Sequence, residues 1–356
     1  MAATRDAAGS SAGRVRYTPV EGAAELFTPA FLDYLTALGD EFTPRVHALR
    51  AARDVVLQRA LRQRVLPGPP PSSPITTGSW RVPPVPADLL RPGIEISGPC
   101  SITSMFINAL NPGPEGERAE GDLDDDEDSA GHRLVDSVRA CHNRVAAVNR
   151  ELAYTDRERG REYRIADGEL PFFMHRERGL HLDEPEVTID GAPIPAAILG
   201  TALTLYSPGR AQADRGQGIY FYLPKVESAD ECAWYRDVFD RSRERLQFLE
   251  NAVIRGVPLV EALPAVYQMD EMLHALGALH AGMERGVDGE PLGQPLEQRR
   301  PAIPVVKRME VDERRPATRR EHAELHGAAP DEDAPLTWAH QRAPPLPAPD
   351  GHQRSV

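Results

Sequence analysis

The run Ile219–Leu223 (IYFYL) is the feature that most constrains the fold of this chain. Aromatic and β-branched side chains favour strands, so these residues are predicted to form a packed strand. An amphipathic helix is predicted next, over residues 233–255, and residues 135–152 carry a weaker helical pattern. Shorter strands are predicted at Ile94–Ser97 and Glu186–Ile189. Strands that alternate with helices indicate an α/β fold of the barrel kind.

The two ends of the chain differ in composition from its middle. Residues 1–25 are rich in Ala, Ser and Gly and are predicted to form a disordered tail, because they lack the apolar stretch of a secretory signal. Residues 26–92 are predicted to hold an N-terminal helical segment of two helices, the second beginning at Pro44, and then a Pro-rich linker. The barrel is assigned to residues 93–308, and the Pro- and charge-rich residues 309–356 to a largely disordered tail.

The charge balance argues against some classes of partner. The formal net charge is −13 and the pI is near 5.4, whereas nucleic-acid binding needs clustered Lys and Arg. No apolar run reaches the roughly 18–20 residues that span a bilayer, so no membrane partner is expected. The three cysteines lie far apart without CxxC spacing, which argues against a disulfide framework and against a zinc site. A reducing compartment is expected, with the cytoplasm as the default location, and the sequence carries no signal for an oligomeric state.

Several short strings, in collinear order across about residues 26–288, resemble malate synthase of the shorter, non-fused class. The clearest of them are Glu95–Pro99 (EISGP), Ile107–Asn111 (INALN), Arg176–Leu182 (RERGLHL), Ile219–Ser228 (IYFYLPKVES), Leu259–Leu263 (LVEAL) and Met269–Leu273 (MDEML). That family folds as a (β/α)8 barrel with an N-terminal helical segment and a C-terminal helical domain. The resemblance therefore implies a TIM-type (β/α)8 barrel, complete or incomplete, behind an N-terminal helical segment.

The reaction that the resemblance implies is the condensation of acetyl-CoA with glyoxylate, followed by thioester hydrolysis to malate and CoA. The acetyl group must lose a proton to a carboxylate base, and the resulting enolate needs a cation beside its oxygen. A magnesium ion with oxygen ligands would hold glyoxylate and polarise its aldehyde. The partners implied are thus two small molecules, glyoxylate and the co-substrate acetyl-CoA, with Mg²⁺ as the cofactor.

Three site residues carry over from the family by position. Arg176 matches the arginine that stabilises the enolate oxygen, Glu261 matches the first magnesium carboxylate, and Asp288 matches the second. The match at Asp288 needs a short gap and lacks the Trp and Tyr of the family motif. Each residue also has a structural interpretation: Arg176 in a surface ion-pair cluster, Glu261 paired with Arg255, and Asp288 as a turn residue before Gly289.

Three departures from the family pattern limit what the resemblance implies. The acidic run Asp122–Asp128 is predicted to be a solvated loop, with a cation site as the alternative, and residues 121–125 align with the family string ADFED. The family strand before that string is apolar, whereas the charges at residues 118–120 argue against burial of a central strand here. The later strands are expected to be shortened. The C-terminal domain, which carries the family's catalytic aspartate, is expected to be absent. An acyltransferase of impaired activity and a catalytically inactive homologue are therefore alternatives, and a CoA-thioester C–C lyase of the citrate lyase beta type shares the barrel and the metal.

Overall fold

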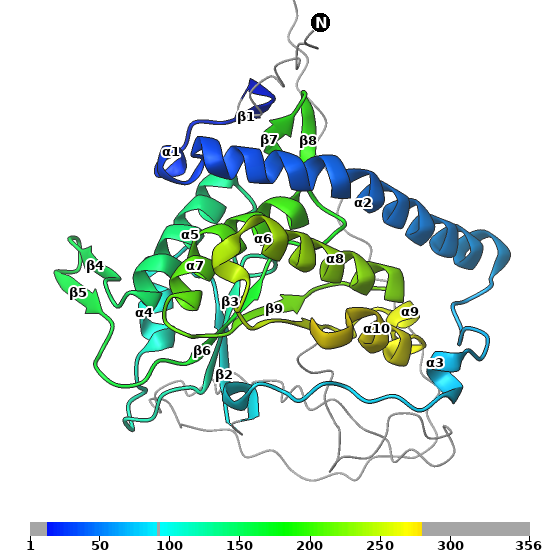
Figure 1. Ribbon diagram of the computed structural model, residues 1–356. Coiled ribbons are helices and arrows are strands. Elements are labelled where there is room, and N and C mark those ends of the chain that lie inside the picture. The colour runs from blue at the N-terminus through cyan, green and yellow to red at the C-terminus, as the bar shows by residue number, and fades with distance from the viewer. Residues whose placement is uncertain (1–12, 91–92, 280–356) are drawn as a thin grey trace, which may run out of the picture. The chain divides into compact units, whose positions relative to one another are not determined.

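Five parallel strands form the central sheet, and each pairs with the next parallel strand along the chain (Figure 1). The computed structural model describes residues 13–90 and 93–279. The parallel strands and the helices between them confirm the predicted α/β class. Within these ranges the strands form an open row with β2 and β10 at its edges, and a closed eight-stranded barrel is not seen there. In sheet order the strands are β2 (Glu95–Gly98), β3 (Gly121–Asp125), β6 (Phe172–Arg176), β9 (Ile219–Leu223) and β10 (Ile254–Pro258).

Helices cover one face of this sheet (Figure 1). Side chains alternate between the two faces of a strand. In β9, Phe221 packs beneath the helices, whereas Tyr220 packs with Leu123 and Met174 on the opposite face. The helices that connect or cover the strands are α4 (Thr103–Leu110), α5 (Leu134–Val148), α6 (Ala196–Tyr206), α7 (Pro208–Ala213), α8 (Ala229–Arg245), α9 (Leu263–Val266) and α10 (Met269–Leu276).

The acidic run is largely buried, with its first four residues in strand β3, and the prediction of a solvated loop was wrong. All five residues of β3 are buried, and the charges at residues 118–120 lie before the strand. Arg144 of α5 places Nη2 2.6 Å from Asp124 Oδ1 and 3.1 Å from Asp126 Oδ2. His175 of β6 places Nδ1 2.6 Å from Asp124 Oδ2. Buried carboxylates persist when they are paired and hydrogen-bonded, so α5 and β6 allow this sequence to form a strand.

The N-terminal helical segment is one long helix, α2 (Pro29–Gln63), capped by the hydroxyl of Thr28. The prediction that a second helix begins at Pro44 was wrong. Phe42 and Val46, on either side of the proline, are fully buried, and α2 contacts both α6 and α8. This packing offsets the backbone hydrogen bond that proline removes from a helix interior.

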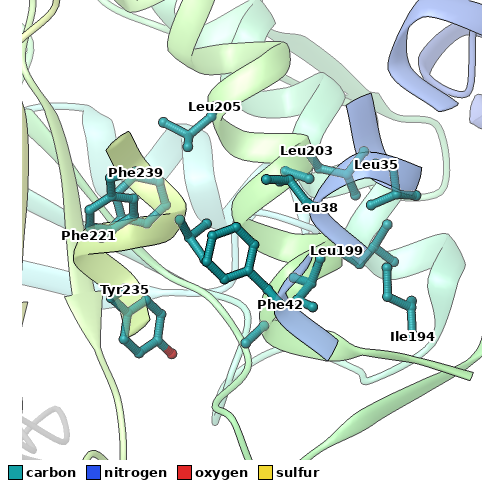
Figure 2. Close-up of a cluster of buried hydrophobic side chains, with 14 of the residues drawn as sticks. Leu35, Leu38, Phe42, Ile194, Leu199, Leu203, Leu205, Phe221, Tyr235 and Phe239 are labelled. Carbon is teal, nitrogen blue, oxygen red and sulfur yellow. The ribbon is translucent and has the colours of Figure 1, made fainter. Parts of the chain in front are cut away.

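The main core lies between α2, α6, α8 and the helix-covered face of β9 (Figure 2). Leu38 and Phe42 of α2 meet Leu199 of α6, and the rings of Phe221 and Phe239 stack with centroids 4.8 Å apart. Burial of each side chain of this size stabilises the fold by about 1.5–3 kcal/mol. The N-terminal segment is therefore part of the same core as the strands.

Ordered structure begins earlier than predicted. Residues 13–25 were assigned to a disordered tail, but Val15–Tyr17 forms β1, which pairs antiparallel with β7 (Asp183–Ile189). The side elements also include α1 (Ala23–Leu26), α3 (Pro74–Thr77), β8 (Ala192–Pro195), the hairpin β4 (Ala153–Asp156) with β5 (Arg161–Arg164), and the 3-10 turns η2 (Ala87–Leu90), η3 (Gln247–Leu249) and η4 (Gly277–Leu279). None of the helices over residues 13–90 and 93–279 is long and apolar enough to cross a membrane.

Candidate active site

Charged side chains gather at the carboxyl edge of the parallel sheet. Asp125 ends β3, Arg176 ends β6, Lys225 follows β9 and Glu261 follows β10. The carboxyl ends of parallel strands all lie at one edge, and in α/β barrels that edge carries the active site. Two of the three residues predicted from sequence, Arg176 and Glu261, therefore share an edge. Asp288 lies outside the described residues.

Arg176 is held by a bidentate pair with Asp125. Its Nε and Nη2 atoms lie 2.9 and 2.6 Å from the two carboxylate oxygens, and the Arg176 side chain is only 13% exposed. Burial opposes the charge of Asp125, but hydrogen bonds from Arg176 and Ser129 outweigh it and lower the pKa of Asp125 to about 2. The third nitrogen, Nη1, lies 3.3 Å from Asp128 and is the part of the guanidinium that Asp125 does not bind. The guanidinium of Arg176 also lies over the ring of Tyr222, with its carbon 6.0 Å from the ring centroid.

Asp125 also shapes the loop that follows β3. Its Oδ1 accepts hydrogen bonds from the backbone N–H groups of Glu127 and Asp128, at 2.9 and 3.1 Å. Its Oδ2 accepts the N–H of Ser129 at 3.0 Å. The Asp125 carboxylate therefore fixes both the guanidinium of Arg176 and the turn that carries Glu127 and Asp128.

Lys225 connects this loop to Glu261. The Lys225 ammonium lies 2.7 Å from Glu127 Oε1, 3.4 Å from Asp128 Oδ1 and 3.9 Å from Glu261 Oε1. Its backbone N–H donates to Glu261 Oε1 at 2.7 Å. Arg176 and Glu261 are thus joined through Asp128 and Lys225, which places the two predicted site residues in one charged network.

The oxygen donors at this edge suit a hard divalent cation such as Mg²⁺. Glu261 is 33% exposed, and Glu127 is buried with an Oε2 atom that has no hydrogen-bond partner. Burial raises the pKa of Glu127, although Lys225 opposes this. Across the described ranges no three His, Cys, Asp or Glu side chains converge closely enough to hold a metal ion. Carboxylate oxygens are the ligand type that Mg²⁺ prefers, and of the predicted ligand pair Glu261 is the member that the structure describes.

Sequence reasoning missed Asp125, Glu127 and Lys225. The first two lie in the run that was assigned to a solvated loop, and only the alternative interpretation of that run as a cation site pointed to them. Lys225 lies inside the string Ile219–Ser228 that carries the resemblance, but a lysine after a strand has no local pattern that marks it as a site residue.

Comparison with known proteins places these residues in a family context. Residues 172–288, which include Arg176, Lys225 and Glu261, match the family model for the malate synthase TIM barrel domain. The chain is 35% identical to malate synthase A of Escherichia coli (strain K12) over 263 residues, which cover 74% of this chain and 48% of that protein.

Two other malate synthases match the chain with similar identity and coverage. Malate synthase of Myxococcus xanthus (strain DK1622) is 35% identical over 266 residues, covering 74% of this chain and 47% of that protein. Malate synthase of Oryza sativa subsp. japonica is 35% identical over 278 residues, covering 76% of this chain and 47% of that protein. The chain spans about half the length of the curated relatives it matches.

Proposed function

We propose, from the kinship of this chain with the malate synthases, that it binds glyoxylate and acetyl-CoA at the carboxyl edge of its sheet and condenses them to malate and CoA. One observation carries the proposal: Arg176 and Glu261, the two described residues that the family motif assigns to catalysis and metal binding, lie in one network at that edge. A site of this kind needs a fixed cation and an exposed carboxylate close together.

Arg176 is suited to stabilise an enolate. Asp125 binds two of its three nitrogens and so fixes the plane of the guanidinium. The remaining nitrogen, Nη1, lies 3.3 Å from Asp128, whose side chain is 55% exposed. A preorganised cation that need not reorient stabilises charge developing on the thioester oxygen, and removal of one such group typically slows a reaction about 10²–10³-fold.

Glu261 would hold Mg²⁺ together with Asp288, which lies outside the described residues. When bound, the ion would polarise the aldehyde of glyoxylate. The carboxylate of Glu261 is oriented for this role by the backbone N–H of Lys225.

We assign the reaction to the cytoplasm, because the three cysteines are free and buried, as is usual in a reducing compartment.

The test is thiol release from acetyl-CoA in the presence of glyoxylate and Mg²⁺. We expect release that requires both substrates, and a drop of about 100-fold or more in kcat/KM for Arg176→Gln. Arg241→Gln is a matched control, because Arg241 forms an exposed ion pair with Glu41 far from the edge and should leave the rate unchanged. Absence of release above background, or equal rates for Arg176→Gln and the wild type, would reject the proposal.

A second candidate, a homologue that binds without turnover, is favoured by the pairing of each cation at the edge. Arg176 and Lys225 both already contact carboxylates. Titration calorimetry with glyoxylate and Mg²⁺ separates the two functions: binding without thiol release supports this candidate. Cleavage of malyl-CoA without free thiol would instead indicate the lyase.

A further inference from the structure

His175 is the only buried histidine among those that the structure describes, with 1% of its surface exposed. It lies on β6 one residue before Arg176, so its side chain points to the opposite face of the sheet. Its Nδ1 atom lies 2.6 Å from Asp124 Oδ2, and its Nε2 atom lies 3.0 Å from Gln212 Oε1. Both ring nitrogens therefore have a hydrogen-bond partner inside the core.

The amide of Gln212 determines which way one of these hydrogen bonds runs. Its Nε2 atom donates to the backbone carbonyl of Gly218 at 3.0 Å, and a carbonyl can only accept. The oxygen of the amide therefore faces His175. Because that oxygen is also an acceptor, the Nε2 atom of His175 must carry a proton. In a neutral imidazole the other ring nitrogen, Nδ1, would then have none.

The contact between Nδ1 and Asp124 requires a second proton. Two acceptors 2.6 Å apart would repel, so a proton lies either on Nδ1 of His175 or on Oδ2 of Asp124. The other oxygen of Asp124 accepts a hydrogen bond from Arg144 Nη2 at 2.6 Å. A guanidinium at that distance favours the ionised form of a carboxyl group. This contact therefore favours the proton on Nδ1.

The charges around Arg144 support the same assignment. Its guanidinium contacts Asp124, Asp126 and Glu177 within 3.1 Å, and none of these side chains is more than 7% exposed. One positive charge does not balance three buried carboxylates. Burial raises the pKa of Asp126 to about 7, so this carboxyl group takes up a proton near neutral pH. An imidazolium at His175 balances a further negative charge.

The other groups around His175 carry no charge that competes with Asp124. Phe221 is the register partner of His175 on β9, with ring centroids 6.0 Å apart, and Gln212 of α7 is neutral. Asp122 lies two residues before Asp124 on β3. Burial, and then the charge of Asp124, raise the pKa of Asp122 well above its usual range, which keeps Asp122 neutral. Asp124 is thus the carboxylate that pairs with the ring.

The pair of His175 and Asp124 belongs to the register of β6 against β3. The next pair along the same two strands is Arg176 with Asp125, whose side chains point to the other face. A shift of β6 by one residue would separate both pairs. The buried pair is poorly screened by salt and solvent, so it ties the position of Arg176 to a strong contact.

We propose that His175 is a positioning residue for Arg176, a doubly protonated imidazole whose buried ion pair with Asp124 sets the register of β6 against β3. The pair keeps Arg176 opposite Asp125, where its guanidinium is ready for a developing negative charge. The role of His175 in turnover rests on the proposed function. Its protonation and its coupling to the pair of Arg176 and Asp125 do not.

The protonation of His175 is measured by NMR on the intact chain labelled with ¹⁵N-histidine. The ring is identified by its nuclear Overhauser effects to the ring of Phe221, so no substitution is needed. We expect both ring nitrogens to carry a bonded proton at pH 7, and both protons to exchange slowly with water, because the side chain is buried. An Nδ1 atom without a proton would place that proton on Asp124 and overturn the ion pair.

The positioning role is tested by a cycle of substitutions on thiol release. His175→Asn places an amide donor near Asp124 but carries no charge. We expect it to lower kcat about tenfold with KM unchanged, because it weakens only the stabilisation that Arg176 gives to the transition state. In the Arg176→Gln background the same substitution should change kcat by less than about twofold. His47→Asn is the matched control, because His47 is exposed on α2.

Urea unfolding at pH 7 measures the coupling without turnover. Asp125→Asn weakens the hold on Arg176, and we expect its effect on the unfolding midpoint to fall to about half or less in the His175→Asn background. The reason is that Arg176 is no longer held opposite Asp125 when the buried pair is lost. The NMR measurement uses the wild type, so it decides the ion pair even if His175→Asn fails to fold.

The outcomes separate the two proposals. An unprotonated Nδ1 atom, additive effects on the unfolding midpoint, or an equal loss of kcat with and without Arg176 overturns the role of His175 and leaves the proposed function in place. Absence of thiol release from the wild type rejects the proposed function. A doubly protonated ring and a coupled midpoint would then still support the buried pair as the contact that positions Arg176.

Discussion

Asp125 has two tasks at the scale of single residues. It fixes the guanidinium of Arg176 through two hydrogen bonds, and it accepts three backbone N–H groups of the loop that carries Glu127 and Asp128. A neutral amide could not reproduce this pattern, because one of its two terminal atoms donates and cannot accept. The charge of Asp125 is therefore linked to the stability of the edge.

Asp125→Asn should make the stability of the protein less sensitive to acid. Since the folded state lowers the pKa of Asp125 from 3.8 to about 2, its contribution is present above pH 4 and is lost as the pH falls toward 2. We expect the variant to lose about 2 kcal/mol of unfolding free energy at pH 7, and the difference from wild type to shrink near pH 3.

Urea unfolding at pH 7, 4 and 3 measures this effect. Asp128→Asn is the control, because that neighbouring carboxylate is 55% exposed and should change the free energy of unfolding by less than about 0.5 kcal/mol. A loss for Asp125→Asn that is the same at all three pH values would contradict the assigned pKa.

The sequence allowed part of the site to be predicted. Arg176 and Glu261 were found because each lies in a string that resembles the family, and the structure brings both to one edge. Lys225 and Glu127 act through contacts between loops that are about a hundred residues apart in sequence. Local pattern carries no information on such a contact, so the charged network could be seen only in three dimensions.

At the scale of elements, β3 shows why local pattern misleads. Its residues GDLDD contain one strongly apolar side chain, and propensity alone assigns them to a loop. Arg144, at a distance of 20 residues in sequence, supplies the charge that makes burial possible. The strand β9 was easier to recognise, because its aromatic and apolar residues satisfy burial without a distant charged partner.

Arg144→Met should therefore destabilise the protein strongly. Arg144 is 2% exposed and contacts Asp124, Asp126 and Glu177, so its loss leaves buried carboxylates unpaired. We expect a loss of about 3–5 kcal/mol in the free energy of unfolding, measured by urea denaturation followed by circular dichroism.

A second substitution tests whether the unpaired charge is the cause. Asp124→Asn in the Arg144→Met background should restore part of the lost stability, because it removes one of the unpaired carboxylates. A loss below about 1 kcal/mol for Arg144→Met, or no recovery in the double variant, would show that β3 is stabilised by other means.

At the scale of the whole molecule, α2 ties the N-terminal segment to the site loops. Its Arg50 donates to the carbonyls of Leu180 and Leu182, which follow β6. Arg53 binds Glu231 through two hydrogen bonds of 2.6 and 2.7 Å and donates to the carbonyl of Lys225. Helical periodicity located the helix but could not show which of its charged residues are buried by loops far along the chain.

Arg53→Met should loosen the loop after β9. Glu231 is 1% exposed and would lose its cation, and the carbonyl of Lys225 would lose its donor. We expect amide hydrogen exchange over residues 225–228 to become about tenfold faster or more, measured by mass spectrometry. Arg45→Met is the control on the same helix, because Arg45 pairs with Asp237 on α8 at the surface. Equal exchange in both variants would contradict the role of α2.

The two faces of β3 have a consequence for how its length can vary. Asp124 and Asp126 point to Arg144, whereas Asp125 points the other way to Arg176. Deletion of a single residue within the strand would exchange these faces and give each guanidinium the side chain intended for the other. A shift of two residues keeps the alternation, so it preserves the faces of the strand, whereas a shift of one residue does not.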